Sequence, residues 1–259
     1  MSAADRPTRR APGAPASVGR APAAADSSTI RRSIPDPRDA PIDDTVAALP
    51  PVPAERLHPD ALRERFHHPP VWTPEFTDDR WRLGPDTPRP AAVLVPLVLR
   101  GDGLGLSVML TVRTAHLSAH AGQIAFPGGR TEPQDGSPVA TALRETEEEI
   151  GLARARVEVL GQLPTYTTGT GFIVTPVVGL VDAEHQLEPD ANEVAEVFEV
   201  PLAYLLDPAN HQRRLYRWSD GLERSFLAMP WRRPEDGREF FVWGVTAAML
   251  RNLYRYIAA

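Results

Sequence analysis

A glycine loop that leads into a short helix with clear start and stop signals constrains this chain more than any other feature. The loop at 127–129, Pro-Gly-Gly, can turn tightly and bring its backbone close to an anion. Ser137 is a favourable helix N-cap, Pro138 suits the first turn, and Gly151 suits the position just past the last turn. The sequence therefore predicts a helix over 138–150 that follows a tight loop.

This helix carries three carboxylates on one side. At 100° per residue, Glu145, Glu148 and Glu149 lie within one arc, because they are i, i+3 and i+4 neighbours. A different face is apolar and is expected to pack on a core; its residues are Val139, Leu143, Thr146 and Ile150. A divalent cation would turn the repulsion among the carboxylates into coordination, because hard ions such as Mg²⁺ bind carboxylate oxygens.

The Glu-x-x-Glu-Glu run taken alone is more typical of a solvent-exposed helix face than of a metal site. The glycine loop, the helix caps and the fixed offset to Arg144 and Glu145 favour the functional interpretation. Arg144 lies four residues before Glu148, so the sequence predicts an ion pair that orients this carboxylate.

The same segment resembles the Nudix box, the loop–helix–loop signature of hydrolases that cleave a nucleoside diphosphate linked to another group. The residues that fit the family pattern are Gly129, Arg144, Glu145, Glu148, Glu149, Gly151 and Leu152. Two features depart from it. The first acid is Asp135 rather than Glu, with one extra residue before Arg144, and Thr146 stands where an aliphatic residue is usual.

The acid and the extra residue both resemble one branch of the family, the coenzyme A pyrophosphatases. The segments at 109–114, Met-Leu-Thr-Val-Arg-Thr, and 122–129, Gly-Gln-Ile-Ala-Phe-Pro-Gly-Gly, are similar to the upstream signature of that branch. Other residues that look like this signature are Leu117, His120 and Gln123. Ser118 stands where its second arginine belongs. The resemblance implies hydrolysis of coenzyme A or acyl-coenzyme A to 3′,5′-ADP and 4′-phosphopantetheine.

The resemblance also implies roles for individual residues. The catalytic set is Glu145, Glu148, Glu149 and Arg144, and its three glutamates would be the ligands of one to three Mg²⁺ or Mn²⁺ ions. The substrate-binding set is Arg113, Gln123, Gly128 and Gly129. Arg113 would pair with a phosphate through its bidentate fork, and the alternative is an ion pair within the fold.

Some candidate residues remain open on sequence alone. A further carboxylate from outside the helix, as ligand or base, is expected at Glu193 or Glu196, for which the alternative is a strand-edge surface charge. His120 is a donor to substrate or a cap of the local turn. The polar loop at 166–171 lines the substrate site or is an ordinary turn.

Composition divides the chain unevenly. Residues 1–52 are rich in Ala, Pro, Arg, Ser and Asp, so we expect a disordered tail that cannot bury enough apolar surface to fold. A helical or irregular extension is expected over 53–88, with a helix at 58–67, and the Nudix hydrolase domain over 89–259.

Composition also limits the class of protein. The chain has 0 Cys, which excludes disulfides and thiolate ligands, and its net charge of -6 argues against a surface that coats nucleic acid. No apolar run has the length of a membrane span or the form of a signal peptide. We therefore expect a cytoplasmic protein with a small-molecule substrate and neither nucleic acid nor membrane as partner; a homodimer is compatible with the sequence.

Hydrophobic patterns predict strands interrupted by one helix and followed by another. Strands are expected at 92–99, 106–112, 157–160, 172–181, 194–200, 213–218, 225–229 and 240–243, and further helices at 201–206 and 244–257. This order predicts the α/β class, as an α/β/α sandwich around a mixed β-sheet, and the Nudix resemblance implies the same architecture.

Two alternatives to coenzyme A hydrolysis remain open. The first is a Nudix diphosphatase that acts on ADP-ribose, dinucleotides or nucleoside triphosphates. The second is a non-catalytic nucleotide-binding module, which would be expected to have lost the carboxylates of the helix. Because Glu145, Glu148 and Glu149 are all present, the sequence favours an enzyme.

Overall fold

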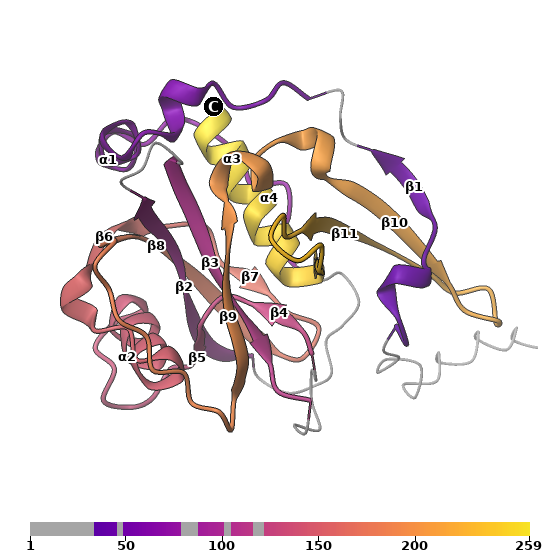
Figure 1. Cartoon of the computed structure of the whole chain (residues 1–259). Helices are drawn as coiled ribbons and strands as arrows, with labels where there is room; N and C mark the ends of the chain where they lie inside the picture. The colour runs from indigo at the N-terminus through magenta and orange to yellow at the C-terminus, as the bar shows by residue number, and fades with distance from the viewer. Residues whose placement is uncertain (1–33, 46–48, 79–87, 101–104, 116–121) are drawn as a thin grey trace, which may run out of the picture.

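The computed structural model describes residues 34–45, 49–78, 88–100, 105–115 and 122–259 (Figure 1). The larger of two sheets contains the strands β2 (Arg89–Arg100), β3 (Gly105–Arg113), β4 (Ile124–Ala125), β5 (Gly128–Arg130), β6 (Val157–Gln162), β7 (Tyr166–Thr167), β8 (Phe172–Val181) and β9 (Val194–Pro201). The pair β2 and β8 is parallel and the other pairs are antiparallel, so the sheet is mixed, as predicted.

The large sheet opens between two of its strands. β2 pairs with β3 near the end of β2, at 97–100, and with β5 near its start, at 91–93. β4 pairs with the far end of β3. The short β4 and β5 therefore line the two sides of an opening, and the glycine loop connects them.

Both faces of this sheet are buried at its centre. In β2, Ala92, Leu94 and Val98 belong to one apolar cluster, whereas Val95 and Leu97 belong to another. Because side chains alternate along a strand, the two clusters lie on opposite faces. This arrangement explains why the sequence of β2 is a continuous apolar run rather than an alternating one.

α2 (Pro138–Ile150) covers the first face, with Ala142 and Ile150 in the cluster. Its caps are as predicted. The Ser137 hydroxyl accepts a hydrogen bond from the backbone N–H of Ala140 at 3.1 Å, and Gly151 has the left-handed conformation at φ 70°.

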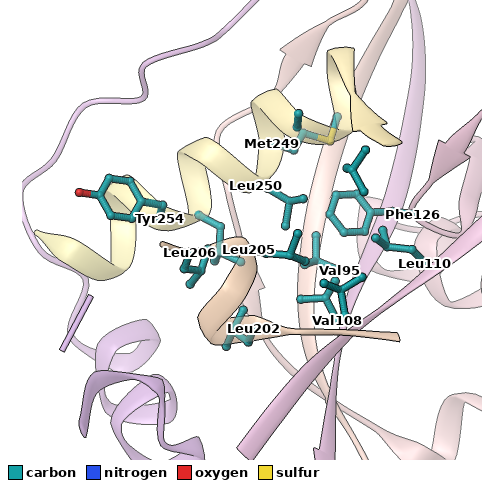
Figure 2. Close-up of a cluster of buried hydrophobic side chains, with 14 of the residues drawn as sticks. Val95, Val108, Leu110, Phe126, Leu202, Leu205, Leu206, Met249, Leu250 and Tyr254 are labelled. Atoms are coloured by element: carbon teal, nitrogen blue, oxygen red, sulfur yellow. The ribbon is translucent and has the colours of Figure 1, made fainter. Parts of the chain in front are cut away.

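α4 (Gly244–Ala258) covers the second face together with the short α3 (Leu202–Leu205). Figure 2 shows side chains of α4, among them Met249 and Leu250, facing side chains of β2, β3 and α3. α4 is buried almost all round, because a second sheet lies on its other side (Figure 1). The α/β/α sandwich is thus confirmed. Within the described part of the chain, no helix combines the length and apolar character needed to cross a membrane.

The second sheet is antiparallel. The sequence patterns predicted most of its strands but did not indicate that they form a sheet of their own. Its strands, in spatial order, are β1 (Ile42–Thr45), β10 (Gln212–Arg217), β11 (Glu223–Arg232) and β12 (Glu239–Trp243). The prediction of disorder through residue 52 is wrong for residues 34–45. Ile34 and Ala40 are buried against Phe226 and Phe241, and the polar β1 is held by backbone pairing, which composition does not reveal.

The extension before β2 is attached to α4. It contains η3 (Ala54–Leu57) and α1 (Pro59–His67), the helix that the sequence predicted. The buried Asn252 side chain accepts hydrogen bonds from the backbone N–H groups of Glu75 and Phe76 at 2.9 and 3.1 Å and donates to the Phe76 carbonyl oxygen at 2.6 Å. The remaining short helices are η2 (Pro37–Asp39), η4 (Arg154–Arg156) and η5 (Pro208–Asn210). The division into domains stays a prediction.

A buried charge network lies beside this attachment. Arg251, whose side chain is 1% exposed, donates to the Glu75 carboxylate at 2.7 Å and to Nδ1 of His211 at 2.9 Å. The other ring nitrogen of His211 lies 2.8 Å from the Leu205 carbonyl oxygen. A guanidinium can only donate, so His211 accepts at Nδ1, donates at Nε2 and is neutral. Burial, together with the Arg251 charge, lowers the pKa of His211 to about 4.

We predict that His211 makes folding pH-dependent in mild acid. Because its pKa is lower in the folded protein than the ordinary value of 6.5, the unfolded chain binds more protons between these values. The free energy of unfolding should therefore fall as the pH drops from about 6.5 to 4, by up to about 3 kcal/mol from this group. Urea unfolding of the parent and of His211→Gln across this range should show a shallower pH slope in the variant. His67→Gln, on the exposed side of α1, is the control and should keep the parental slope.

Candidate active site

The glycine loop is closed tightly on the sheet and on α2. Gly128 has φ 149°, and a Cβ there would lie 2.4 Å from the carbonyl oxygen of Ala92. At Gly129, a Cβ would lie 2.3 Å from a carboxylate oxygen of Glu145. Glycine is therefore required at Gly128, where a Cβ would meet the backbone of β2 at a positive φ, whereas a Cβ at Gly129 would displace the Glu145 carboxylate.

Glu149 lies beneath this loop with 9% of its surface exposed. The backbone N–H of Gly128 donates to Oε2 of Glu149 at 3.0 Å. Burial raises the pKa of Glu149 to about 7, and the negative charges of Glu193 and Glu145 add to that rise. The carboxylates of Glu193 and Glu145 thus lie close enough to the buried Glu149 to raise its pKa.

The separation of acidic and apolar faces on α2 is wrong at Glu149. This residue lies three positions after the buried Thr146, so it shares the side of the helix that faces the sheet. Glu148 has a side chain that is 60% exposed, and Glu145 lies between these extremes at 18%. The three carboxylates therefore run from the interior to the surface.

Arg144 connects the acidic groups of the loop and the helix. It donates to Glu148 at 2.8 Å, which confirms the predicted ion pair, and to Glu145 at 3.0 Å. It also donates to both carboxylate oxygens of Asp135, at 3.0 and 2.8 Å, and to the Arg130 carbonyl oxygen at 3.0 Å. Hydrogen bonds from Arg144 hold the pKa of Asp135 far below its usual range, so this carboxylate is ionised.

The position of Asp135 gives the first acid of the box a structural role. The side chain is 4% exposed and also accepts hydrogen bonds from the backbone N–H of Glu132 at 2.9 Å and from the Thr141 hydroxyl at 3.0 Å. It therefore fixes the loop between β5 and α2, and with it Arg144. The sequence motif alone did not predict this contact, although the fixed spacing of Asp135 to Arg144 was the available signal.

The predicted substrate-binding residues meet at one end of the large sheet. Arg113 ends β3, and its charge lowers the pKa of Glu149, against the larger effect of burial. The backbone N–H of Arg113 donates to the Gln123 carbonyl oxygen at 2.9 Å. Leu117, Ser118 and His120 lie outside the described residues.

The structure separates the two candidates for a further carboxylate. Glu193 precedes β9, and its charge raises the pKa of Glu149, so it lies toward the buried carboxylate. Glu196 is instead paired with Arg233 at 2.9 Å and with Arg238. The surface-charge alternative therefore suits Glu196 better than Glu193.

The carboxylates of Glu145, Glu148 and Glu149 are suitable ligands for a hard divalent cation, but they are not arranged around one point. Within the described ranges, no group of three or more His, Asp or Glu side chains is close enough to hold a metal ion. Glu145 and Glu149 nevertheless lie close enough for the charge of Glu145 to raise the pKa of Glu149, and their carboxylate oxygens are of the kind that such an ion prefers. Metal binding by Glu145, Glu148 and Glu149 stays a prediction.

Comparison with known proteins identifies the family. The NUDIX domain model matches residues 88–219, half of the chain. The chain belongs to the Nudix family. It is 42% identical over 166 residues to the uncharacterized Nudix hydrolase NudL of Escherichia coli (strain K12), a match that covers 64% of this chain and 81% of that protein. The Yersinia enterocolitica NudL is 41% identical over 170 residues, covering 64% of this chain and 80% of its own.

Solved structures with some likeness to this Nudix protein include the M. smegmatis Nudix hydrolase RenU. It is 21% identical, the match covers 53% of this chain and 83% of that chain, and the TM-score is 0.41. Family membership makes this chain an enzyme, a hydrolase that acts on a diphosphate bond. Nudix enzymes act on small nucleotide substrates and generally use divalent metal ions such as Mg²⁺ or Mn²⁺.

We predict that alanine affects mainly stability at Gly128 and mainly turnover at Gly129. Gly128→Ala should lower the free energy of unfolding by about 3 kcal/mol or more, because its Cβ meets backbone atoms at a positive φ. Gly129→Ala should change stability much less, because the Glu145 side chain can move, but it should lower kcat strongly by displacing that carboxylate. Urea unfolding and steady-state kinetics on both variants check this. Equal loss of stability in the two variants would contradict it.

Proposed function

We propose that this Nudix hydrolase cleaves the diphosphate of coenzyme A or acyl-coenzyme A to 3′,5′-ADP and 4′-phosphopantetheine. The observation that carries the reaction class is the buried Glu149 carboxylate beneath the Gly128 N–H, beside Glu145 and Glu193. The choice of coenzyme A is supported by the similarity of segments 109–114 and 122–129 to the signature of the coenzyme A pyrophosphatases.

Each residue has a task in this proposal. A bound Mg²⁺ or Mn²⁺ would activate the attacking water and neutralise the leaving phosphate. Glu145, Glu148 and Glu149 would be its ligands, and Arg144 holds the first two through hydrogen bonds of 3.0 and 2.8 Å. Glu193 is our candidate for the base that takes the proton of the water.

The substrate diphosphate is expected between the glycine loop and the end of β3. Arg113 has no ion pair within the described residues, so its guanidinium is available for a phosphate oxygen. Backbone groups of Gly128 and Gly129 and the side chain of Gln123 complete the proposed binding set. Without side chains at the glycines, a phosphate can approach the loop closely.

Product analysis tests this proposal directly. With coenzyme A and Mg²⁺ or Mn²⁺, mass spectrometry should detect 3′,5′-ADP and 4′-phosphopantetheine, and kcat/KM should exceed that for ADP-ribose. Glu148→Gln should lose most turnover while remaining folded, because its exposed carboxylate contributes little to packing. Equal or better rates on ADP-ribose would overturn the choice of substrate. Near-parental turnover in Glu148→Gln at saturating Mg²⁺ would overturn the metal assignment.

We also predict that Glu149 links metal binding to stability. Its pKa is raised to about 7, so its contribution to stability is full below the ordinary value of 4.5 and is lost as the pH rises through about 7. At pH 8 without metal, Glu149→Gln should therefore have a higher Tm than the parent. Mg²⁺ should raise the Tm of the parent but not that of this variant.

The matched control is Glu147→Gln on the exposed side of the same helix, where Glu147 is paired with Arg154 at 2.9 Å. It should keep the parental response to Mg²⁺. An equal Mg²⁺-induced rise of Tm in Glu149→Gln and the parent would exclude Glu149 as a ligand.

A further inference from the structure

Three arginines of the described chain have guanidinium groups that make no hydrogen bond or ion pair. They are Arg89, Arg113 and Arg130, and all three belong to strands that end around the glycine loop. Most other described arginines donate to a carboxylate or a carbonyl oxygen, and the whole chain has a net charge of -6. Arginines without an acidic partner in an acidic protein indicate a place for an anionic ligand.

Two of these arginines lie on the same face of the sheet. In the β2–β5 pair, Ala91 is directly opposite Arg130, so their side chains point to the same side. Arg89 lies two residues before Ala91 and shares that side. Arg89 and Arg130 are therefore diagonal neighbours, about 7–8 Å apart at the backbone. Ala91 belongs to the cluster that contains α4, which identifies the face.

Arg89 is held in place by the β7–β8 loop. Its guanidinium carbon lies 4.4 Å from the ring centre of Phe172, and its backbone N–H donates to the Gly171 carbonyl oxygen at 2.9 Å. In the same loop, the Thr168 hydroxyl accepts from the backbone N–H of Phe172 at 3.0 Å and lies 3.0 Å from the exposed Thr170 hydroxyl. The Arg89 guanidinium thus lies on the ring of Phe172, a residue that is itself fixed by hydrogen bonds within the loop.

Arg130 directly follows Gly129 in β5, so the pair of arginines lies next to the contacts of the glycine loop with α2. Gly129 faces Glu145, and the carbonyl oxygen of Arg130 accepts from Arg144. Among the described residues, β5 has a strand partner only on its β2 side. A ligand at the other edge of β5 can therefore reach the carboxylates on one face and the two arginines on the other, past glycines that have no side chain.

We propose that Arg89 and Arg130 form a second anion subsite, which binds a phosphate group that is one sugar ring away from the scissile diphosphate. This inference rests on the proposed function and deepens it. The subsite recognises the 3′-phosphate, the group that distinguishes coenzyme A from dephospho-coenzyme A. Charged fork contacts to phosphate are strong and specific for arginine, so the pair acts as a specificity determinant.

Steady-state kinetics on coenzyme A and dephospho-coenzyme A tests the subsite in the full chain. The ratio of kcat/KM for the two substrates should favour coenzyme A in the parent, and Arg89→Gln and Arg130→Gln should each lower that ratio about tenfold. Arg89→Lys should retain part of it, because the charge remains. Arg156→Gln is the control, since Arg156 is exposed and paired with Asp182 away from this sheet end, and it should keep the parental ratio.

Calorimetric binding of 3′,5′-ADP and of 5′-AMP separates this inference from the proposed reaction. A preference for the bisphosphate that is lost in Arg89→Gln and Arg130→Gln supports the subsite, even if coenzyme A is not hydrolysed and the proposed function fails. Hydrolysis of coenzyme A without any preference over dephospho-coenzyme A overturns the subsite and leaves the reaction standing. An unchanged kcat/KM ratio in both variants also overturns it.

Discussion

The contact between the Gly128 backbone and the Glu149 carboxylate is the constraint on which the rest of the site depends. Gly128 is bound into the sheet by its pairing with β2, and its N–H is the hydrogen-bond donor that reaches a carboxylate near the end of α2. The loop, the sheet and the helix are therefore fixed to each other at one point. Burial of Glu149 beside Glu145 and Glu193 concentrates negative charge there, and the neighbouring Arg113 only partly offsets it. A site with this electrostatic imbalance is suited to recruit a cation.

Arg144 holds the acidic side chains of the loop and of α2 together through hydrogen bonds. It holds Asp135 with two hydrogen bonds and contacts Glu145 and Glu148 as well, so one guanidinium fixes the loop on one side and two carboxylates on the other. Such sharing keeps flexible glutamate side chains in a narrow range of positions. The sheet opens between β4 and β5 beside these residues, and the residues that we propose to bind the substrate belong to the strands around that opening.

The sequence predicted much of this fold because its local signals agree with its tertiary structure. β8 was predicted over its observed range, and the caps of α2 were identified from Ser137 and Gly151. The burial of Glu149 was not foreseen, because helical spacing groups residues by angle but does not say which side faces the sheet. The strand at 42–45 was missed because Ile-Asp-Asp-Thr has no apolar alternation, and its backbone pairing with β10 is not visible in a local pattern. The separation of the two sheets depends on contacts of α4 with both, and no local pattern encodes them.

The attachment of residues 75–76 to Asn252 spans most of the chain. Asn252 and the buried Arg251 lie in the last helix, whereas their partner Glu75 precedes the whole large sheet. During synthesis on the ribosome, the early segment leaves the exit tunnel long before the residues that satisfy it exist. Its polar backbone groups must stay hydrated until the C-terminal helix arrives. Completion of this part of the molecule is therefore a late step in folding, and loss of α4 would leave residues 75–76 without the side chain that satisfies their backbone groups.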